Sequence, residues 1–194
     1  MVVEAPAGLA REPRLHPLLA DRWSPRDFDR SHDLTDAEVD ALLEAARWAP
    51  SVGNSQPWRF GVARRGTAEH DAVVDTLVPR NRTWADGASA LVVVAAQTVG
   101  ADGRDQPWAE YDTGQAVAHL TIQAEHQGLA VRQMGGFDRH RLARLLDDAG
   151  SVTPLVVLAV GRRSEDGPAA QPRDRLPLDA LRVAITAAPV PAAA

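Results

Sequence analysis

The chain has 194 residues and contains neither cysteine nor lysine. Without cysteine, the protein has no disulfide, no thiol nucleophile and no thiolate ligand for zinc or an iron–sulfur cluster. Without lysine, it has no side-chain amine for Schiff-base chemistry or for attachment of pyridoxal phosphate. All 21 basic residues are arginines. Positive charge is therefore informative only through the places where individual arginines lie.

Long apolar runs and an excess of positive charge are also missing. A membrane-spanning helix needs about 18 or more consecutive apolar residues, and no segment of the chain reaches that length. The first residues, MVVEAPAGLAREPR, lack the basic, apolar and cleavage-site regions of a signal peptide. A net charge of −5 disfavours a nucleic-acid-binding surface, which must neutralise phosphates. We therefore expect a cytoplasmic protein that binds neither membranes nor nucleic acid.

Apolar residues make up 45% of the chain, enough for one globular domain with a buried core. We predict a single domain over residues 1–194, of which the Ala- and Pro-rich residues 182–194 form a frayed tail. Beyond Gly161 the chain has little apolar periodicity, so we expect this part to dock on a partner subunit rather than fold back alone. Two continuous apolar runs, ALVVVAA and PLVVLAV, predict strands covered on both faces. The pattern predicts helices within 35–49, 67–77, 108–127 and 138–149, and strands over 58–63, 90–96, 129–131 and 154–160.

Common catalytic signatures are absent as well. The sequence has no G-x-G-x-x-G, Walker A, G-x-S-x-G or H-E-x-x-H motif. A Rossmann cofactor site, a P-loop, a hydrolase elbow and a zincin site are therefore unsupported. His119 and His126 are seven residues apart, and metal ligation favours spacings of three or four, so we expect no metal site.

Four polar segments remain as candidates for a ligand site. Arg22, Ser24 and Arg26 can offer two guanidinium groups and a hydroxyl to one anion, or form surface ion pairs with Asp21 and Asp27. The uncharged loop 49–58 can line a ligand or merely connect two elements. The paired glycines 135 and 136 can bring the backbone close to a flat ligand or only form a turn. The tail adds two more arginines, Arg173 and Arg175.

Together these segments resemble the nitroreductase family of FMN-dependent NAD(P)H oxidoreductases. The family signature Arg-x-Ser-x-(Arg/Lys)-x-Phe corresponds to residues 22–28, and Ala-Pro-Ser-x-x-Asn-x-Gln-Pro-Trp is complete at residues 49–58. Asn81 precedes the central strand, a Gly-Gly-Phe-Asp turn follows the long helix at residues 135–138, and Arg-x-Arg-Leu-Pro stands at residues 173–177. The resemblance covers residues 15–181.

The resemblance implies an α+β fold, with a central, mostly antiparallel sheet flanked by helices, and an intertwined homodimer with FMN at its interface. It places Arg22, Arg173 and Arg175 at the FMN phosphate, with Ser24 beside them. It places Arg26 near N1 and the C2 carbonyl of the flavin, Asn81 at the pyrimidine edge, and the N–H of Gly135 opposite N5. Residues from the other subunit complete the expected site, namely Pro50, Ser51 and Asn54. Trp23, Met134 and Gly136 also belong to the predicted cofactor-binding set, and no side chain is assigned a catalytic role.

The implied function is hydride transfer from NADH or NADPH, through flavin N5, to a nitroaromatic, a quinone or a similar electrophile by a ping-pong mechanism. Two alternatives are a flavin-binding protein without turnover and a specialised biosynthetic dehydrogenase or dehalogenase. Two features depart from the family pattern. Trp23 stands where a polar residue is common, and the stretch between Ala96 and Trp108 is too short for the helical excursion that shields the flavin in larger members. We therefore expect an open or differently covered active site.

Overall fold

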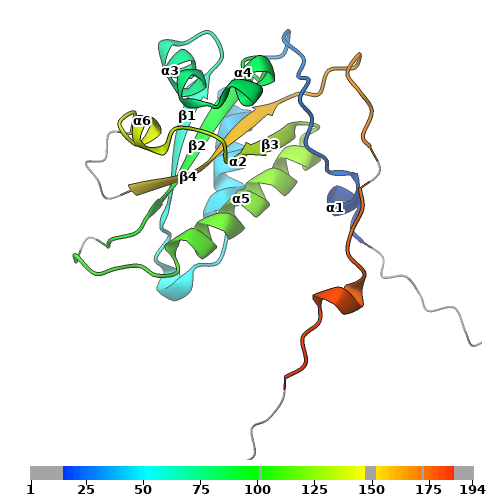
Figure 1. Cartoon of the computed structure of the whole chain (residues 1–194). Coiled ribbons are helices and arrows are strands. Elements are labelled where there is room, and N and C mark those ends of the chain that lie inside the picture. The colour runs from blue at the N-terminus through cyan, green and yellow to red at the C-terminus, as the bar shows by residue number, and fades with distance from the viewer. Residues whose placement is uncertain (1–14, 101, 147–151, 172, 186–194) are drawn as a thin grey trace, which may run out of the picture.

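A four-stranded antiparallel sheet forms the centre of the protein (Figure 1). The computed structural model describes residues 15–100, 102–146, 152–171 and 173–185. The strands lie in the order β1-β2-β4-β3, and each neighbouring pair is antiparallel. Their bounds are β1 Trp58–Arg64, β2 Ala90–Gln97, β3 Ala130–Met134 and β4 Val152–Gly161. The predicted combination of helices with a mostly antiparallel sheet is confirmed.

The two continuous apolar runs form the inner strands, as predicted. Val92 of β2 pairs with Val62 of β1 on one side and with Leu158 of β4 on the other. Strands β2 and β4 are covered on both faces, which is why neither shows the alternation of a half-exposed strand. The outer strands β1 and β3 are the edges of the sheet.

Helices cover both faces of the sheet. On one face, α2 (Asp36–Arg47) and α5 (Ala109–His126) pack against the sheet through Leu42, Ala46, Leu120 and Ala124. On the other face lie three shorter helices, α3 Ala68–Thr76, α4 Pro79–Ala85 and α6 Arg139–Ala143. The short helix α1 (Pro17–Asp21) lies near α5. None of the described helices is long and apolar enough to span a membrane.

The N-terminus of α2 shows how local sequence sets an element boundary. The Thr35 side chain accepts a hydrogen bond from the N–H of Glu38 (3.2 Å), and the Glu38 carboxylate accepts one from the N–H of Thr35 (2.8 Å). This reciprocal pair is the capping box expected from the Thr-x-x-Glu spacing. It satisfies two backbone donors that would otherwise lack a helical partner.

Two helix predictions need correction. The helix predicted from Asp138 to Ala149 ends at Ala143, because i to i+3 turns then direct Leu146 against the sheet while Leu145 stays 47% exposed. Ala149 and Gly150 lie outside the described residues. Helix α4 was not predicted, although Pro79 at its first position is a recognised helix-start signal.

The chain leaves the sheet after β4 and runs past α1 (Figure 1). A single 3-10 turn, η2 (Leu178–Leu181), interrupts this tail. Its large apolar side chains are exposed, reaching 97% at Ile185. Residues 186–194 of the predicted frayed tail lie outside the described residues. The described tail is therefore not packed into the core of its own subunit.

Candidate functional site

A cleft of about 480 Å³ lies beside the edge strand β3. Its walls come from the segment at the end of α1, from the C-terminal half of α5 and from β3. The lining residues are Leu19, Arg22, Ser24, Ala118, Thr121, Ile122, Arg132 and Gln133. The volume lies within the range of small-molecule sites.

The segment after α1 places the first predicted arginine in this cleft. A guanidinium nitrogen of Arg22 donates to the hydroxyl of Ser24 (3.1 Å). The buried Phe28 anchors the segment in the second core cluster and forms an isolated β-bridge with Arg163. The buried Pro25 and Phe28 hold this segment, Arg22 and Ser24 line the cleft, and Arg26 is exposed beside it.

The predicted tail arginines lie beside Arg22. The guanidinium of Arg173 donates to the backbone carbonyls of Arg22 and Ala20. Burial lowers the pKa of Arg22, and the positive charges of Arg173 and Arg175 lower it further. Like charges gathered in this way disfavour one another, and an anion bound between them would relieve the repulsion.

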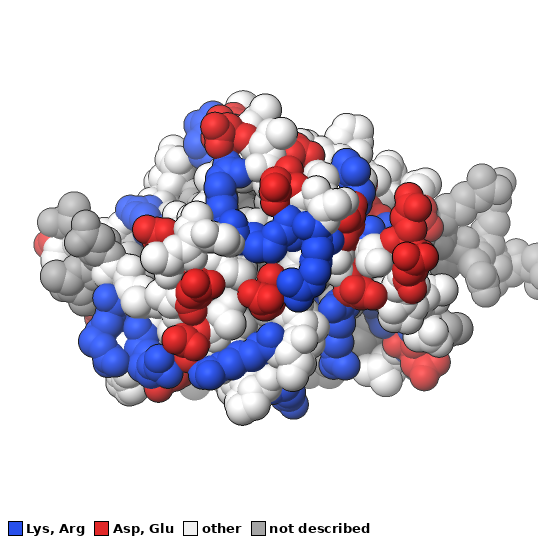
Figure 2. All heavy atoms as spheres, turned by 90° about the horizontal axis from the view of Figure 1, so that it is seen from above, with Lys and Arg blue, Asp and Glu red and all other residues white. Residues whose placement is uncertain are grey.

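The carboxylate of Glu125 opposes this lowering of the Arg22 pKa, but it is ion-paired with Arg163. In the described chain eight arginines, Arg163 among them, lie within 4.0 Å of an Asp or Glu oxygen. Figure 2 shows this mixing of charges on the face above α3 and α4. Arg22, Arg26, Arg132, Arg173 and Arg175 have no such partner among the described residues. Six other described arginines also lack such a partner, so what distinguishes these five is their position: Arg22 and Arg132 line the cleft, and the charges of Arg173, Arg175 and Arg26 act on them.

Two further arginines at the site were missed from the sequence. Arg132 of β3 lines the cleft, donates to the backbone carbonyl of Ser24 and lies 5.3 Å from the centre of the Trp84 ring. Arg163 pairs with Glu125 and lies 5.9 Å from the centre of the Trp23 ring. Trp23 is thus a half-buried packing partner of an arginine. The available signal for Arg132 was a charged residue inside a short strand with buried residues at both ends.

The glycine pair meets the predicted asparagine. The side-chain amide of Asn81 donates to the carbonyl of Gly136 (3.2 Å), and the N–H of Val78 donates to the same oxygen (3.0 Å). A Cβ atom at Gly136 would lie 2.8 Å from Val78 Cγ2, so this close approach requires glycine. Gly135 is exposed, and a Cβ there would meet nothing within 4 Å. Its backbone is open to a flat ligand, whereas the Met134 side chain is buried in the core.

The loop after α2 lies elsewhere in the same subunit. Its 3-10 turn η1 (Val52–Asn54) is fixed by the N–H of Val52, which donates to the buried Asp112 carboxylate near the start of α5 (2.9 Å). Ser51 Oγ accepts from the N–H of Gln56 (3.1 Å). The cleft, by contrast, is lined by Ile122, which lies ten residues after Asp112 on α5. At 1.5 Å per residue the two positions are about 15 Å apart. One subunit therefore does not bring Pro50, Ser51 and Asn54 to Arg22.

Two non-glycine residues in this loop have left-handed backbone conformations, Asn54 (φ 56°) and Gln56 (φ 47°). Asparagine tolerates this region better than most residues, whereas glutamine adopts it less readily. Gly53, with φ 59°, precedes them. The loop is therefore held in a specific, mildly strained shape, which is more common in ligand-binding loops than in simple connectors.

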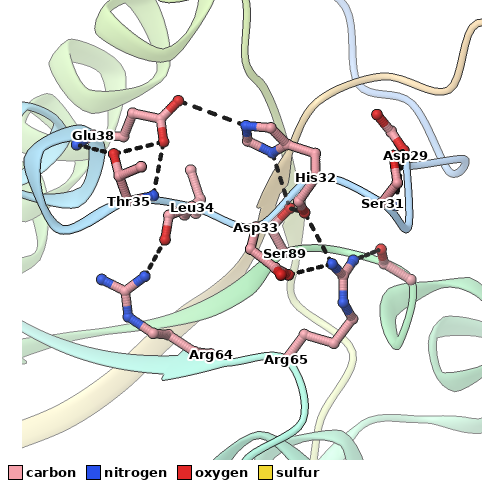
Figure 3. Close-up of polar contacts among 11 residues, drawn as sticks. Asp29, Ser31, His32, Asp33, Leu34, Thr35, Glu38, Arg64, Arg65 and Ser89 are labelled. Atoms are coloured by element: carbon pink, nitrogen blue, oxygen red, sulfur yellow. Dashed lines mark hydrogen bonds and ion pairs between the residues drawn. The ribbon is translucent and has the colours of Figure 1, made fainter.

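A second polar cluster ties the segment before α2 to the sheet (Figure 3). The Ser89 hydroxyl donates to the carbonyl of His32 (2.6 Å), and Arg65 donates to the same carbonyl (2.9 Å). His32 also contacts Ser89 Oγ (3.3 Å) and the Glu38 carboxylate (3.6 Å). This Ser-His-Glu grouping resembles a hydrolytic triad in composition. Ser89, however, is 3% exposed and donates its proton to a backbone oxygen, so the cluster is structural.

The fold and the cleft define an α+β protein with a cationic ligand site at a sheet edge and an exposed glycine backbone nearby. Residues 19–162 match the Nitroreductase family. The chain belongs to this family, as the sequence resemblance indicated.

Relatives agree with this assignment. The oxygen-insensitive NAD(P)H nitroreductase of Salmonella typhimurium is 31% identical, over 81% of this chain and 93% of its own length. The "uncharacterized 15.4 kDa protein in ask 5′ region" of Mycolicibacterium smegmatis is 37% identical over 62% of this chain and 91% of its own length. A solved structure described as "the oxidoreductase containing FMN" is 30% identical, with a TM-score of 0.74 and 84% of each chain covered.

Proposed function

We propose that this protein is an FMN-dependent oxidoreductase that passes hydride from NADH or NADPH to a nitroaromatic, a quinone or a similar electrophile by a ping-pong mechanism. The observation that supports this most is that Arg22 and Arg132 line one cleft while the charges of Arg173, Arg175 and Arg26 act on them from beside it. The names of relatives support the same class, since one is an NAD(P)H nitroreductase and another contains FMN.

The residues present fit FMN. Its terminal phosphate is a dianion, and guanidinium groups bind phosphate through two parallel hydrogen bonds. We assign Arg22, Arg173 and Arg175 to this phosphate, with Ser24 offering its hydroxyl. The absence of a dinucleotide-binding fingerprint favours FMN over FAD. FMN when bound would supply the redox chemistry, since its N5 accepts and donates hydride.

The remaining residues would orient the flavin ring. We assign Arg26 to the N1 and C2 carbonyl side, where a cation stabilises the anionic reduced state. Asn81 would face the pyrimidine edge, and the N–H of Gly135 would point toward N5. The bond from Asn81 to the carbonyl of Gly136 supports this assignment, because it holds the asparagine and the glycine backbone in a fixed relation. Trp23 would support the phosphate region through Arg163.

The other half of the site would come from a second copy of the chain. Pro50, Ser51 and Asn54 lie near one end of α5 and the arginines near the other, so a copy packed antiparallel along α5 would bring the two sets together. An apolar groove of about 670 Å³ between α2 and α5 runs along this face, where Trp48 is 72% exposed. The exposed apolar tail would cover the partner, completing an intertwined homodimer.

The absorption spectrum of the purified protein tests the cofactor. We expect flavin bands, release of FMN on heating, and NADH- or NADPH-dependent reduction of a quinone. Recovery of FAD, or no flavin after reconstitution, would contradict the assignment. Bound FMN without turnover would identify a flavin-binding protein, and turnover only with a particular biosynthetic intermediate would identify the specialised enzyme. The cytoplasmic location stays a prediction.

A further inference from the structure

Arg132 is the one cleft-lining charge that the family signatures leave without a role. It is half-buried on an edge strand, next to the exposed Gln133. Burying a guanidinium without a carboxylate costs free energy. Among the described residues none supplies a carboxylate within 4.0 Å of Arg132. A compensating interaction is therefore expected.

The surroundings of Arg132 identify which part of the cleft it serves. Its guanidinium stacks on Trp84, which lies three residues after Asn81 on α4 and therefore on the same side of that helix. Burial lowers the pKa of Arg132, and the charge of Arg26 lowers it further, so the two guanidinium groups share one neighbourhood. Arg132 thus lies close to both residues assigned to the pyrimidine edge.

A purely structural role explains only part of this geometry. The guanidinium donates to the carbonyl of Ser24 and so ties the signature segment to β3. A neutral amide could make the same single bond without placing a second cation beside Arg26. Trp84 holds the guanidinium over its ring, and the bond to Ser24 leaves the other N–H groups available to a planar acceptor.

We propose that Arg132 is a further cofactor-binding residue, held in place by Trp84, whose charge acts with Arg26 on the pyrimidine edge of the flavin and favours the reduced state. This inference rests on the proposed function. It distinguishes Arg132 from the phosphate arginines, because a phosphate contact stabilises both redox states of the flavin equally.

The test compares the affinity of each redox state of FMN in Arg132→Gln, Arg132→Lys and Trp84→Leu proteins. The matched control is Arg65→Gln, which removes another arginine that donates to backbone carbonyls. Arg65 follows β1, three strand spacings or roughly 14 Å from β3. We expect Arg132→Gln to weaken binding of the reduced state at least tenfold more than that of the oxidised state. Since 29.6 mV corresponds to a factor of ten, the potential should fall by about 30 mV.

Arg132→Lys should retain most of the potential, and Trp84→Leu should lower it less than Arg132→Gln does. Arg65→Gln should reduce stability and leave the potential unchanged. Equal weakening of both redox states would overturn the proposal in favour of a phosphate contact. Unchanged affinity and potential would show that Arg132 only holds the segment around Ser24 against β3. If Arg132→Gln does not fold, an unchanged potential in Trp84→Leu overturns the proposal. A parent protein that binds no flavin instead refutes the proposed function.

Discussion

Replacing Arg22 with glutamine should weaken cofactor binding strongly and change the stability of the free protein little. Arg22 is half-buried and crowded by Arg173 and Arg175, so its charge is unfavourable until an anion binds. Removing one partner of a desolvated charge pair costs about 2–5 kcal/mol. Because Arg22 is partly exposed, we take the lower part of this range, about 2–3 kcal/mol, which is roughly a 30- to 150-fold loss of FMN affinity.

The free protein should lose little by the same change. The hydrogen bond to Ser24 is a single side-chain contact of about 1 kcal/mol, and relief of the repulsion from Arg173 and Arg175 opposes its loss. We expect the free energy of unfolding of the apoprotein to change by no more than about 1 kcal/mol.

Two titrations check this prediction. Quenching of FMN fluorescence measures the affinity, and urea unfolding of the apoprotein measures stability. Arg80→Gln is the matched control, because it removes one exposed arginine from α4 and changes the net charge equally. Wild-type affinity in Arg22→Gln, or the same loss of affinity in both variants, would refute the phosphate assignment. A loss of several kcal/mol from the apoprotein would show that Arg22 is structural.

Arg26→Gln should lower the flavin potential by tens of millivolts, because it weakens binding of reduced FMN more than binding of oxidised FMN. Arg26→Lys should restore most of the potential. An unchanged potential in spectroelectrochemistry would show that Arg26 is a surface residue. Light scattering at micromolar concentration should give the mass of a dimer for the flavin-bound protein, and a flavin-bound monomer would contradict the shared site. Burial lowers the pKa of the fully buried His70, which has no hydrogen-bond partner for either ring nitrogen among the described residues. Asp86 and Asp71 oppose this shift and Arg65 reinforces it. The unfolded chain therefore takes up this proton first, and stability should fall as the pH drops below about 6.5. Urea unfolding at pH 8 and pH 5 should show a smaller loss in His70→Leu than in the parent, and an equal loss would be evidence against this source. Thr35→Ala should cost about 1 kcal/mol through the lost capping box, without loss of FMN affinity; unchanged urea unfolding would contradict the contribution of the cap.

Local rules predicted most of the sheet and the longer helices. The runs around Val93 and Val157 are uniformly apolar because both faces of β2 and β4 are covered. The capping box at Thr35 located the start of α2 from four residues alone. Such features depend on residues that are close together in the chain, so they can be predicted from the local sequence.

Features set by distant contacts were harder to predict. Helix α6 ends early because Leu146 packs on the sheet, a tertiary contact that overrides the helical period. Arg132 carries no motif, and its role depends on Trp84 and Ser24, which lie far away in sequence. The arginines at Arg22 and Arg173 were predicted as a set only through the family resemblance. The structure supplies the contacts between them.

In the proposed dimer each flavin is held between two copies of the chain. A mixed dimer of Arg22→Gln and Asn54→Gly subunits tests it, since glycine accepts the left-handed backbone of Asn54. If sites are shared, one site receives both substitutions and the other receives neither. We predict that the purified mixed dimer binds one FMN with wild-type affinity, although each parent homodimer binds only weakly. If neither site of the mixed dimer recovers that affinity, each subunit holds its own flavin, and the shared site is contradicted.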